Sequence, residues 1–248
     1  MIDGAAPVEK FDEIDSTVLE ARRRAERGEL GPVWLVAKVQ TAGRGRRGRS
    51  WASLEGNLMA TYLFATQRAP AEIALLGFAA GVAIAETLDQ IVAPGRATLK
   101  WPNDVLLDGA KAAGIMLDSG AIAGGAWAAL AFGVNLAVAP DGLDQQTTSL
   151  RAALPPDAPA PEPLAFLAQL RPRLEAWDAR VEREGFEPLR RAWLGRAHGL
   201  GRAARVMQGG EAIEGRIAGL SPRGELELDT ETGRRLIAAG DVFLPNAA

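Results

Sequence analysis

The segment VWLVAKVQTAGRGRRGRSW, residues 33–51, joins an apolar run to a loop of glycine and arginine. The run over residues 33–37 is typical of a strand that is buried on both faces. Residues 43–49 contain four arginines and three glycines, which give a flexible backbone with exposed N–H groups in a dense positive field. That combination suits a polyanion such as a nucleoside triphosphate.

The same basic loop has two other interpretations, a nucleic-acid-binding patch and a merely solvated loop. We favour a binding loop at the edge of a sheet, because a second apolar strand is predicted over residues 57–64 and the chain as a whole has a net charge of −3. Only four of the 28 basic residues are lysines. Lys100 and Lys111 are therefore candidates for positions where a compact ammonium is needed and the wider guanidinium would not serve.

Around this segment, hydrophobic periodicity predicts helices and short strands. One helix is predicted to end at Gly28, with Thr17 and Glu20 forming a capping box at its start. An amphipathic helix is predicted over residues 164–181, which Pro172 should kink or divide by splitting off the first turn. The remaining predicted elements are strands over residues 11–15, 97–100, 105–107, 112–117 and 126–134, a helix over 73–91 and a proline-rich loop over 151–163.

Near Gly199 the hydrophobic pattern changes to period two, and glycine-containing turns separate short alternating strands as far as Leu244. About fifty residues of tight hairpins predict a small barrel that is marginally stable alone and docks on the larger domain. We therefore predict two domains, over residues 1–195 and 196–248.

The composition excludes several classes of site. The chain has no cysteine and one histidine, His198, which excludes disulfides, thiolate zinc sites, cysteine nucleophiles and histidine clusters. No uninterrupted apolar run reaches the roughly 18 residues of a membrane span. The N-terminus lacks the basic and apolar regions of a signal peptide, so the expected location is the cytoplasm.

Three further segments carry candidate functional groups: Lys100-Trp-Pro-Asn-Asp104, Lys111-Ala-Ala-Gly-Ile115 and Phe132-Gly-Val-Asn-Leu136. Taken singly, the first has the composition of an ordinary turn and Lys111 that of a charge protecting a strand edge. The first two segments, however, place two of the four lysines, Lys100 and Lys111, near one Asn-Asp pair. The third ends an apolar strand with a glycine that admits close backbone approach and an asparagine that can bind a hydroxyl.

Together with the arginine-rich loop, these segments closely resemble the motifs of the biotin protein ligases, in the same order. The resemblance extends from Asp15-Ser16-Thr17 to the small C-terminal barrel, which is similar to the SH3-like domain of that family. It implies an α/β (α+β) catalytic domain built on a mixed sheet and related to lipoate ligases. It also implies an ATP-dependent ligase that forms biotinyl-5′-AMP and transfers biotin to a lysine of a biotin carboxyl carrier domain.

The resemblance also assigns roles to individual residues. Lys111 would bridge the biotin carboxylate and the α-phosphate, and Arg46 would close the loop over the adenylate. Trp51 would pack either against the biotin chain or into the core beneath the loop. The full biotin-binding set is Ser16, Thr17, Gln40, Gly43, Arg44, Gly45, Arg46, Trp51, Lys111, Gly114 and Gly133. The ATP-binding set is Arg44, Arg49, Lys100, Asn103, Asp104 and Asn135.

The substrates would be ATP and biotin, with Mg²⁺ carried by the phosphates rather than by a protein metal site. Val18 departs from the family pattern, which commonly has asparagine there. Only about fifteen residues precede Ser16, too few for a DNA-binding domain, so no DNA partner is expected. No membrane partner is expected either, and the expected assembly is a weak homodimer. The alternatives are a lipoate or octanoate ligase of the same fold, and a nucleic-acid-binding protein that uses residues 43–49.

Overall fold

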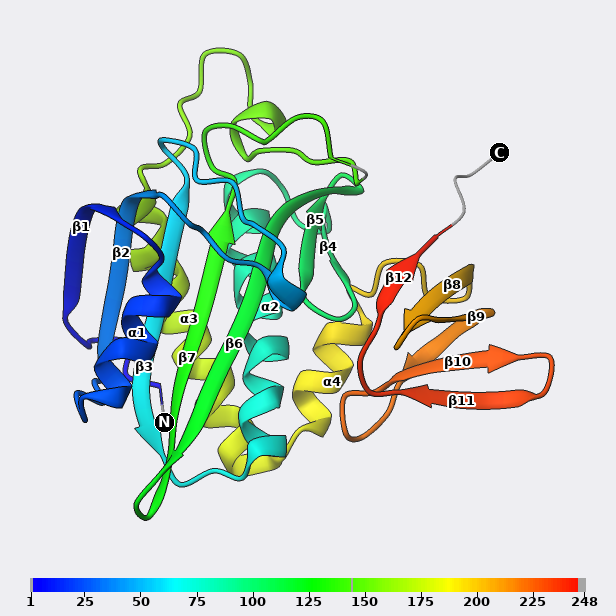
Figure 1. The fold of residues 1–248 in the computed structure, drawn as a ribbon. Coiled ribbons are helices and arrows are strands. Elements are labelled where there is room, and N and C mark those ends of the chain that lie inside the picture. Colours follow the sequence, from blue (N-terminus) through cyan, green and yellow to red (C-terminus); the bar gives the residue numbers. More distant parts are fainter. Residues whose placement is uncertain (1, 144, 245–248) are drawn as a thin grey trace.

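The computed structural model describes residues 2–143 and 145–244 (Figure 1). Its larger sheet has seven strands in the order β1-β2-β3-β7-β6-β5-β4. β1 and β2 are parallel, and the other neighbouring pairs are antiparallel, so the predicted α/β class with a mixed sheet is confirmed. The strands are β1 (Val8–Ile14), β2 (Val33–Gln40), β3 (Leu58–Thr66), β4 (Ala97–Lys100), β5 (Asp104–Leu107), β6 (Ala110–Ile122) and β7 (Gly125–Val134).

Helices cover both faces of this sheet (Figure 1). α1 (Thr17–Glu26) packs on one face against Leu35 and other alternate residues of the central strands. α2 (Pro70–Ile91) and α3 (Pro163–Glu184) pack on the other face, in the cluster that contains Trp34. Since successive side chains of a strand point to opposite faces, covering both faces requires β2 to be apolar at consecutive positions.

α2 is the most apolar helix of the fold. By length and composition alone it could span a membrane, with a mean hydropathy of 1.6 over its most apolar window. In the structure 67% of that window is buried inside the protein, against the sheet and α3. α2 is therefore a core helix of the domain, and its small residues allow it to lie close to the strands.

One local prediction about a helix is wrong. The N-cap of α1 is Ser16 rather than Thr17, and its side chain makes no capping hydrogen bond. Glu20 instead accepts hydrogen bonds from Arg23 and Arg24 one turn further on, because the two guanidinium groups compete successfully for its carboxylate. The capping box is therefore absent from this helix.

Of the two effects expected of Pro172, the split of the first turn does not occur, since α3 continues through the proline from Pro163 to Glu184, and the kink stays a prediction. Buried Leu170 and Leu174 lie on either side of the proline, and their packing against the core compensates for the missing backbone donor. The helix ends instead at Gly185, whose φ of 75° favours glycine. A separate short helix, α4 (Glu187–Leu194), follows that break.

The C-terminal sheet has five antiparallel strands in the order β11-β10-β9-β8-β12. It docks on the larger domain through Gly224, where a side chain would lie 2.7 Å from the ring of Phe78. Trp101 Nε1 donates a hydrogen bond of 3.2 Å to the carbonyl of the same glycine. The strands are β8 (Ala203–Gln208), β9 (Glu211–Leu220), β10 (Leu226–Thr230), β11 (Gly233–Ile237) and β12 (Asp241–Phe243).

A buried carboxylate near the end of α2 fixes the connection that leads into β4. Asp89, 6% exposed, accepts hydrogen bonds from the backbone N–H groups of Gly95 and Ala97 at 3.0 and 2.9 Å. It also pairs with the Arg196 guanidinium at 2.6 Å. Burial raises the pKa of Asp89, but the hydrogen bonds from Arg196 and from the two backbone donors outweigh it, so the net pKa lies below the ordinary 3.8.

We predict that Asp89→Ala lowers the free energy of unfolding by about 3 kcal/mol, because it leaves a partly buried guanidinium without its carboxylate partner and two backbone donors without their acceptor. Urea denaturation at neutral pH measures this loss. Since the folded pKa is depressed, the stabilisation is present above the ordinary pKa of 3.8 and is lost as the pH falls below it. The difference between wild type and variant should therefore shrink in acid; a difference independent of pH would contradict the assignment.

Candidate active site

One cleft contains most of the residues that the sequence motifs identified. It lies between the start of α1, the arginine loop that follows β2, the β4–β5 turn and strand β12, and holds about 1000 Å³ of empty space including its open mouth. The predicted residues that line it are Ser16, Thr17, Gln40, Arg44, Gly45, Arg46, Arg49, Trp51, Lys100, Asn103, Asp104, Lys111, Gly114 and Gly133.

Gly43 and Asn135 do not line the cleft. Gly43 is buried at the base of the arginine loop, where its carbonyl accepts the Trp51 N–H at 2.9 Å. Asn135 is 2% exposed and donates from Nδ2 to the Thr148 carbonyl at 3.1 Å, while its Oδ1 is buried without a partner. The Gly43 backbone and the Asn135 side chain support the loops around the cleft in this structure, and ligand contacts by these two residues stay predictions.

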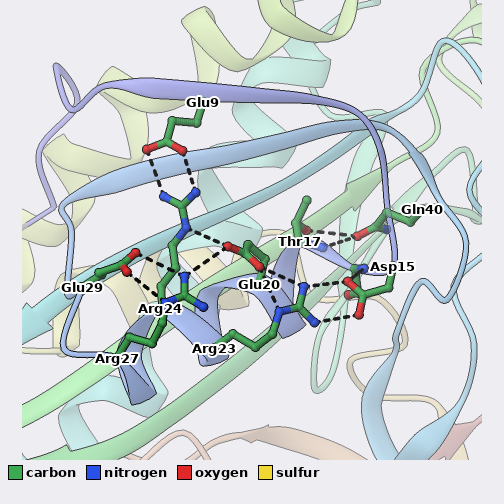
Figure 2. A network of polar contacts seen from close by, with 10 residues as sticks. Glu9, Asp15, Thr17, Glu20, Arg23, Arg24, Arg27, Glu29 and Gln40 are labelled. Atoms are coloured by element: carbon green, nitrogen blue, oxygen red, sulfur yellow. Dashed lines mark hydrogen bonds and ion pairs between the residues drawn. The ribbon is translucent and has the colours of Figure 1, made fainter.

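The polar end of the cleft is built where α1 begins. Thr17 donates from its N–H and from its hydroxyl to Gln40 Oε1, at 2.8 and 3.1 Å (Figure 2). Thr61 in turn donates from its hydroxyl to that of Thr17 at 2.8 Å. Both contacts of Gln40 engage its oxygen, and within the described residues its Nε2 has no hydrogen-bond partner. The amide is therefore oriented as a donor for a ligand oxygen.

Ion pairs behind α1 hold this polar end in place. Arg23 binds both carboxylate oxygens of Asp15, at 2.7 and 2.9 Å (Figure 2). Asp15 Oδ1 also accepts the N–H of Ser16 at 2.6 Å. Arg24 joins Glu9 of β1 to Glu20 of its own helix. The network ties the strand, the turn and the helix together, and so fixes the position of the Ser16-Thr17 pair.

The arginine loop is a compact hairpin rather than an extended strap. Arg44 and Ser50 form an isolated antiparallel bridge, and the N–H of Gly45 donates to the Arg49 carbonyl at 2.8 Å. Between them, residues Arg46–Gly48 form a short turn in which Arg47 has left-handed backbone angles, with φ 56° and ψ 35°. Gly48 has a φ of 75°, which favours glycine. The turn lets one short segment place the guanidinium groups of Arg44, Arg46 and Arg49 at the cleft.

Trp51 anchors this loop to the sheet. An ideal Cβ on Gly133 of β7 would lie 2.2 Å from Trp51 Cε2, and one on Gly114 of β6 would lie 2.9 Å from Cζ3. The indole therefore occupies the space that the two glycines leave open. Its Nε1 is buried without a hydrogen-bond partner, and Lys111 Nζ lies 5.7 Å from the ring centroid.

The other end of the cleft is strongly cationic. Lys111 Nζ pairs with Asp104 Oδ1 at 2.7 Å, and Arg46 Nη1 donates to Asn103 Oδ1 at 3.1 Å. Within the described part of the chain, the Lys100 ammonium has no hydrogen bond or ion pair; burial, together with nearby Lys111, lowers its pKa. Burial also lowers the pKa of the Arg46 guanidinium, with Arg47 adding to the effect.

The charge balance of the cleft indicates an anionic ligand. Five cationic and two acidic side chains line it, which leaves an excess of three positive charges. Side chains held together in spite of mutual repulsion attract anions, and a partly buried cleft screens them less than open solvent does. A ligand with several negative charges at one end and hydrogen-bonding groups at the other fits this arrangement.

Sequence reasoning missed Asp241, Phe243 and Gln145, which also line the cleft. Gln145 Nε2 donates to Asp104 Oδ2 at 3.3 Å. Asp241 and Phe243 belong to β12, far along the chain from every motif, and no local pattern marks them. Val18, where the family commonly has asparagine, lines the cleft and is 5% exposed within the apolar cluster under α1.

Comparison with known protein families now places the chain. Residues 11–135 match the biotin/lipoate A/B protein ligase family, and residues 199–244 match the biotin protein ligase C-terminal domain. The chain is 39% identical over 233 residues to a biotin--[acetyl-CoA-carboxylase] ligase of Paracoccus denitrificans, covering 92% of this chain and 97% of that protein. It therefore belongs to the biotin/lipoate A/B protein ligase family, as one of its biotin protein ligases.

Further relatives agree with this placement. A biotin--[acetyl-CoA-carboxylase] ligase of Mycobacterium tuberculosis is 31% identical over 227 residues, covering 89% of this chain and 82% of that protein. The structure of the biotin protein ligase from Aquifex aeolicus in complex with biotin and ATP superposes with a TM-score of 0.80 and 25% identity, covering 97% of this chain and 99% of that one. Neither the lipoate ligase nor the nucleic-acid-binding alternative is favoured by these matches.

The contact between Trp51 and Gly133 can be tested by its effect on stability. Gly133→Ala should lower the free energy of unfolding by about 1–3 kcal/mol, because the new methyl group displaces the indole. In a Trp51→Ala background the same substitution should cost less than about 0.5 kcal/mol, since the obstacle has gone. Denaturant titration of the two single variants and the double variant gives this coupling.

Gly77→Ala in α2 is the matched control, because nothing lies within 4 Å of its ideal Cβ. It should leave stability unchanged or raise it slightly, as alanine is the better helix former. Equal costs of Gly133→Ala with and without the tryptophan would show that Trp51 does not occupy this space in solution.

Proposed function

We propose that this chain is an ATP-dependent biotin protein ligase, which forms biotinyl-5′-AMP and then transfers biotin to a lysine of a carrier domain. The observation that carries the proposal is one cleft with an ordered hydrogen-bonding end, at Thr17 and Gln40, and a cationic end around Lys111 and the arginine loop. Biotin has a polar ureido ring at one end and a carboxylate at the other. ATP adds its triphosphate at the carboxylate end.

In the first step a biotin carboxylate oxygen attacks the α-phosphorus of ATP, and the bond to the pyrophosphate leaving group breaks. Both reactants are anions, so the main barrier is their repulsion, and preorganised cations lower it. Lys111 is proposed to lie between the carboxylate and the α-phosphate, exchanging Asp104 for the ligand oxygens. Arg44 and Arg49 are proposed to bind phosphate oxygens.

In the second step the amine of a carrier lysine attacks the carbonyl carbon of the mixed anhydride, and AMP leaves with its bonding electron pair. The attacking nitrogen loses a proton as the amide forms. Until then the anhydride must be kept from water. The Arg46–Asn103 hydrogen bond supports a role for Arg46 in holding the loop over this intermediate.

The proposed protein partner is a biotin carboxyl carrier domain of acetyl-CoA carboxylase, because the Paracoccus and Mycobacterium relatives are named as biotin--[acetyl-CoA-carboxylase] ligases. Both carboxylates of the cleft, Asp104 and Asp241, are engaged by cations. That arrangement fits a Mg²⁺ ion bound mainly to the phosphates and water. A cytoplasmic location, a weak homodimer and the absence of DNA and membrane partners stay predictions.

A direct assay tests the function. The full chain is incubated with ATP, an acceptor carrier domain, and either biotin or lipoate, and the carrier is examined by mass spectrometry. We expect one biotinyl group per carrier, on a single lysine, and none when ATP is omitted. Modification by lipoate alone, or an unmodified carrier with biotin, would overturn the proposal.

We predict that Lys111→Ala nearly abolishes pyrophosphate release while the protein remains folded, because it removes the ammonium proposed to lie between the two anions. Lys111→Arg should restore little activity, since the planar guanidinium is wider. The matched control is Lys38→Ala, which removes a lysine paired with Asp12 at 2.6 Å outside the cleft. Release at close to the wild-type rate by Lys111→Ala would remove this lysine from its proposed role.

A further inference from the structure

The C-terminal sheet places a carboxylate on the arginine loop. Asp241, in the first position of β12, pairs with Arg47 at 2.9 Å through Oδ2, and the same oxygen accepts a shorter hydrogen bond from Arg49. These partners lie 194 and 192 residues apart in the chain. The carboxylate also lines the cleft itself, and its side chain is 25% exposed.

The two sides of this contact differ in how firmly they are held. Asp241 belongs to a strand that pairs with β8 through Met207, and the neighbouring Val242 is buried in the C-terminal core. The arginine loop is held by one isolated bridge, a few backbone bonds and its single tryptophan. When the contact breaks, the arginine side chains can therefore move more easily than Asp241.

Arg49 is thus bound to a carboxylate at the place where the proposed reaction requires phosphate oxygens. A guanidinium whose donors face Asp241 cannot present the same donors to a triphosphate. Lys111 stands in the same relation to Asp104. The empty cleft therefore satisfies part of its positive charge with its own carboxylates, and a ligand must replace them.

We propose that Asp241 is a displaceable counter-anion that holds Arg49 in the empty enzyme and yields it to the triphosphate of ATP, with Arg47 as a second partner of the carboxylate outside the cleft. This rests on the proposed function, because it requires the triphosphate to bind at the cationic end of the cleft. Asp241 then sets the affinity for the nucleotide without touching it. It also makes the C-terminal domain a determinant of ATP binding through charge alone.

The sign of the effect follows from the charges. Asp241→Asn preserves the size of the side chain and raises the positive excess of the cleft by one. Two anions no longer compete for the same guanidinium groups, so ATP should bind about fivefold more tightly, the size expected for one partly exposed charge pair. The gain should diminish at high salt, because screening weakens interactions among exposed charges.

The experiment is isothermal titration of the full-length protein with α,β-methylene ATP, without biotin, at low and at high salt. Inorganic triphosphate is a second probe, which assigns the effect to the phosphate chain. Asp241→Glu retains the charge and should resemble wild type, whereas Asp241→Ser removes it and should resemble Asp241→Asn. The matched control is Asp229→Asn, which breaks an exposed ion pair to Arg234 on the same sheet outside the cleft and should leave affinity unchanged.

Thermal melting of every variant accompanies the titrations, and the two uncharged variants give independent readings if one is poorly folded. Tighter binding of both probes by the uncharged variants, lost at high salt, is the expected result. Unchanged or weaker binding by these variants, with wild type binding normally, would overturn the role of Asp241 and leave the ligase proposal intact. Failure of wild type to bind either probe, with biotin absent and with biotin added, would overturn the role of Asp241, whereas the ligase proposal stands or falls with the carrier assay.

Discussion

Trp51 positions the arginine loop over the sheet. Its indole packs on β6 and β7 where each strand has a glycine. Gly114 and Gly133 let the indole lie against the backbone of β6 and β7, at distances that a Cβ would not permit. The loop is thereby held over the strand that carries Lys111. A glycine-rich segment with four like charges would otherwise repel itself and spread into solvent. Anchoring it at one aromatic residue places its cations at the cleft.

The cleft is then best understood through its balance of charge. Its cations exceed its carboxylates, and those carboxylates hold cations that the proposed reaction needs, Asp104 on Lys111 and Asp241 on Arg49. Such pairs limit the repulsion between cations in the empty protein. They also keep the reacting cations close to the positions where anions will arrive. Binding is then an exchange of one set of anions for another, which favours ligands of high charge.

Much of the fold could be predicted from the sequence because its signals are local. The continuous apolar run of β2 indicated burial on both faces, and Trp34 and Leu35 do face opposite helix layers. The glycine and arginine composition of residues 43–49 pointed to a loop that lines the cleft for the same reason: its charge and flexibility can be read within one short segment. The motif residues around Lys100 and Lys111 also converge on the cleft.

Features that depend on tertiary contacts could not be predicted in this way. Glu20 had the spacing of a capping box, yet two arginines of the same helix engage its carboxylate. Asp241 lines the cleft because the C-terminal sheet docks beside the cleft. The residues next to Asp241 in the sequence form no motif that would indicate this position. Gly133 was expected to contact biotin, which stays a prediction; the packing of the Trp51 indole on this glycine is a tertiary contact that no local pattern showed.

A crystal structure of the protein with a non-hydrolysable analogue of biotinyl-5′-AMP tests the central claim most directly, because it shows which cations meet the phosphate. The account predicts the ureido ring beside Gln40 and the phosphoryl oxygens within hydrogen-bonding distance of Lys111 Nζ. It also predicts that Lys111 has left Asp104. A ligand bound outside this cleft, or bound within it while Lys111 stays paired with Asp104, would contradict the account.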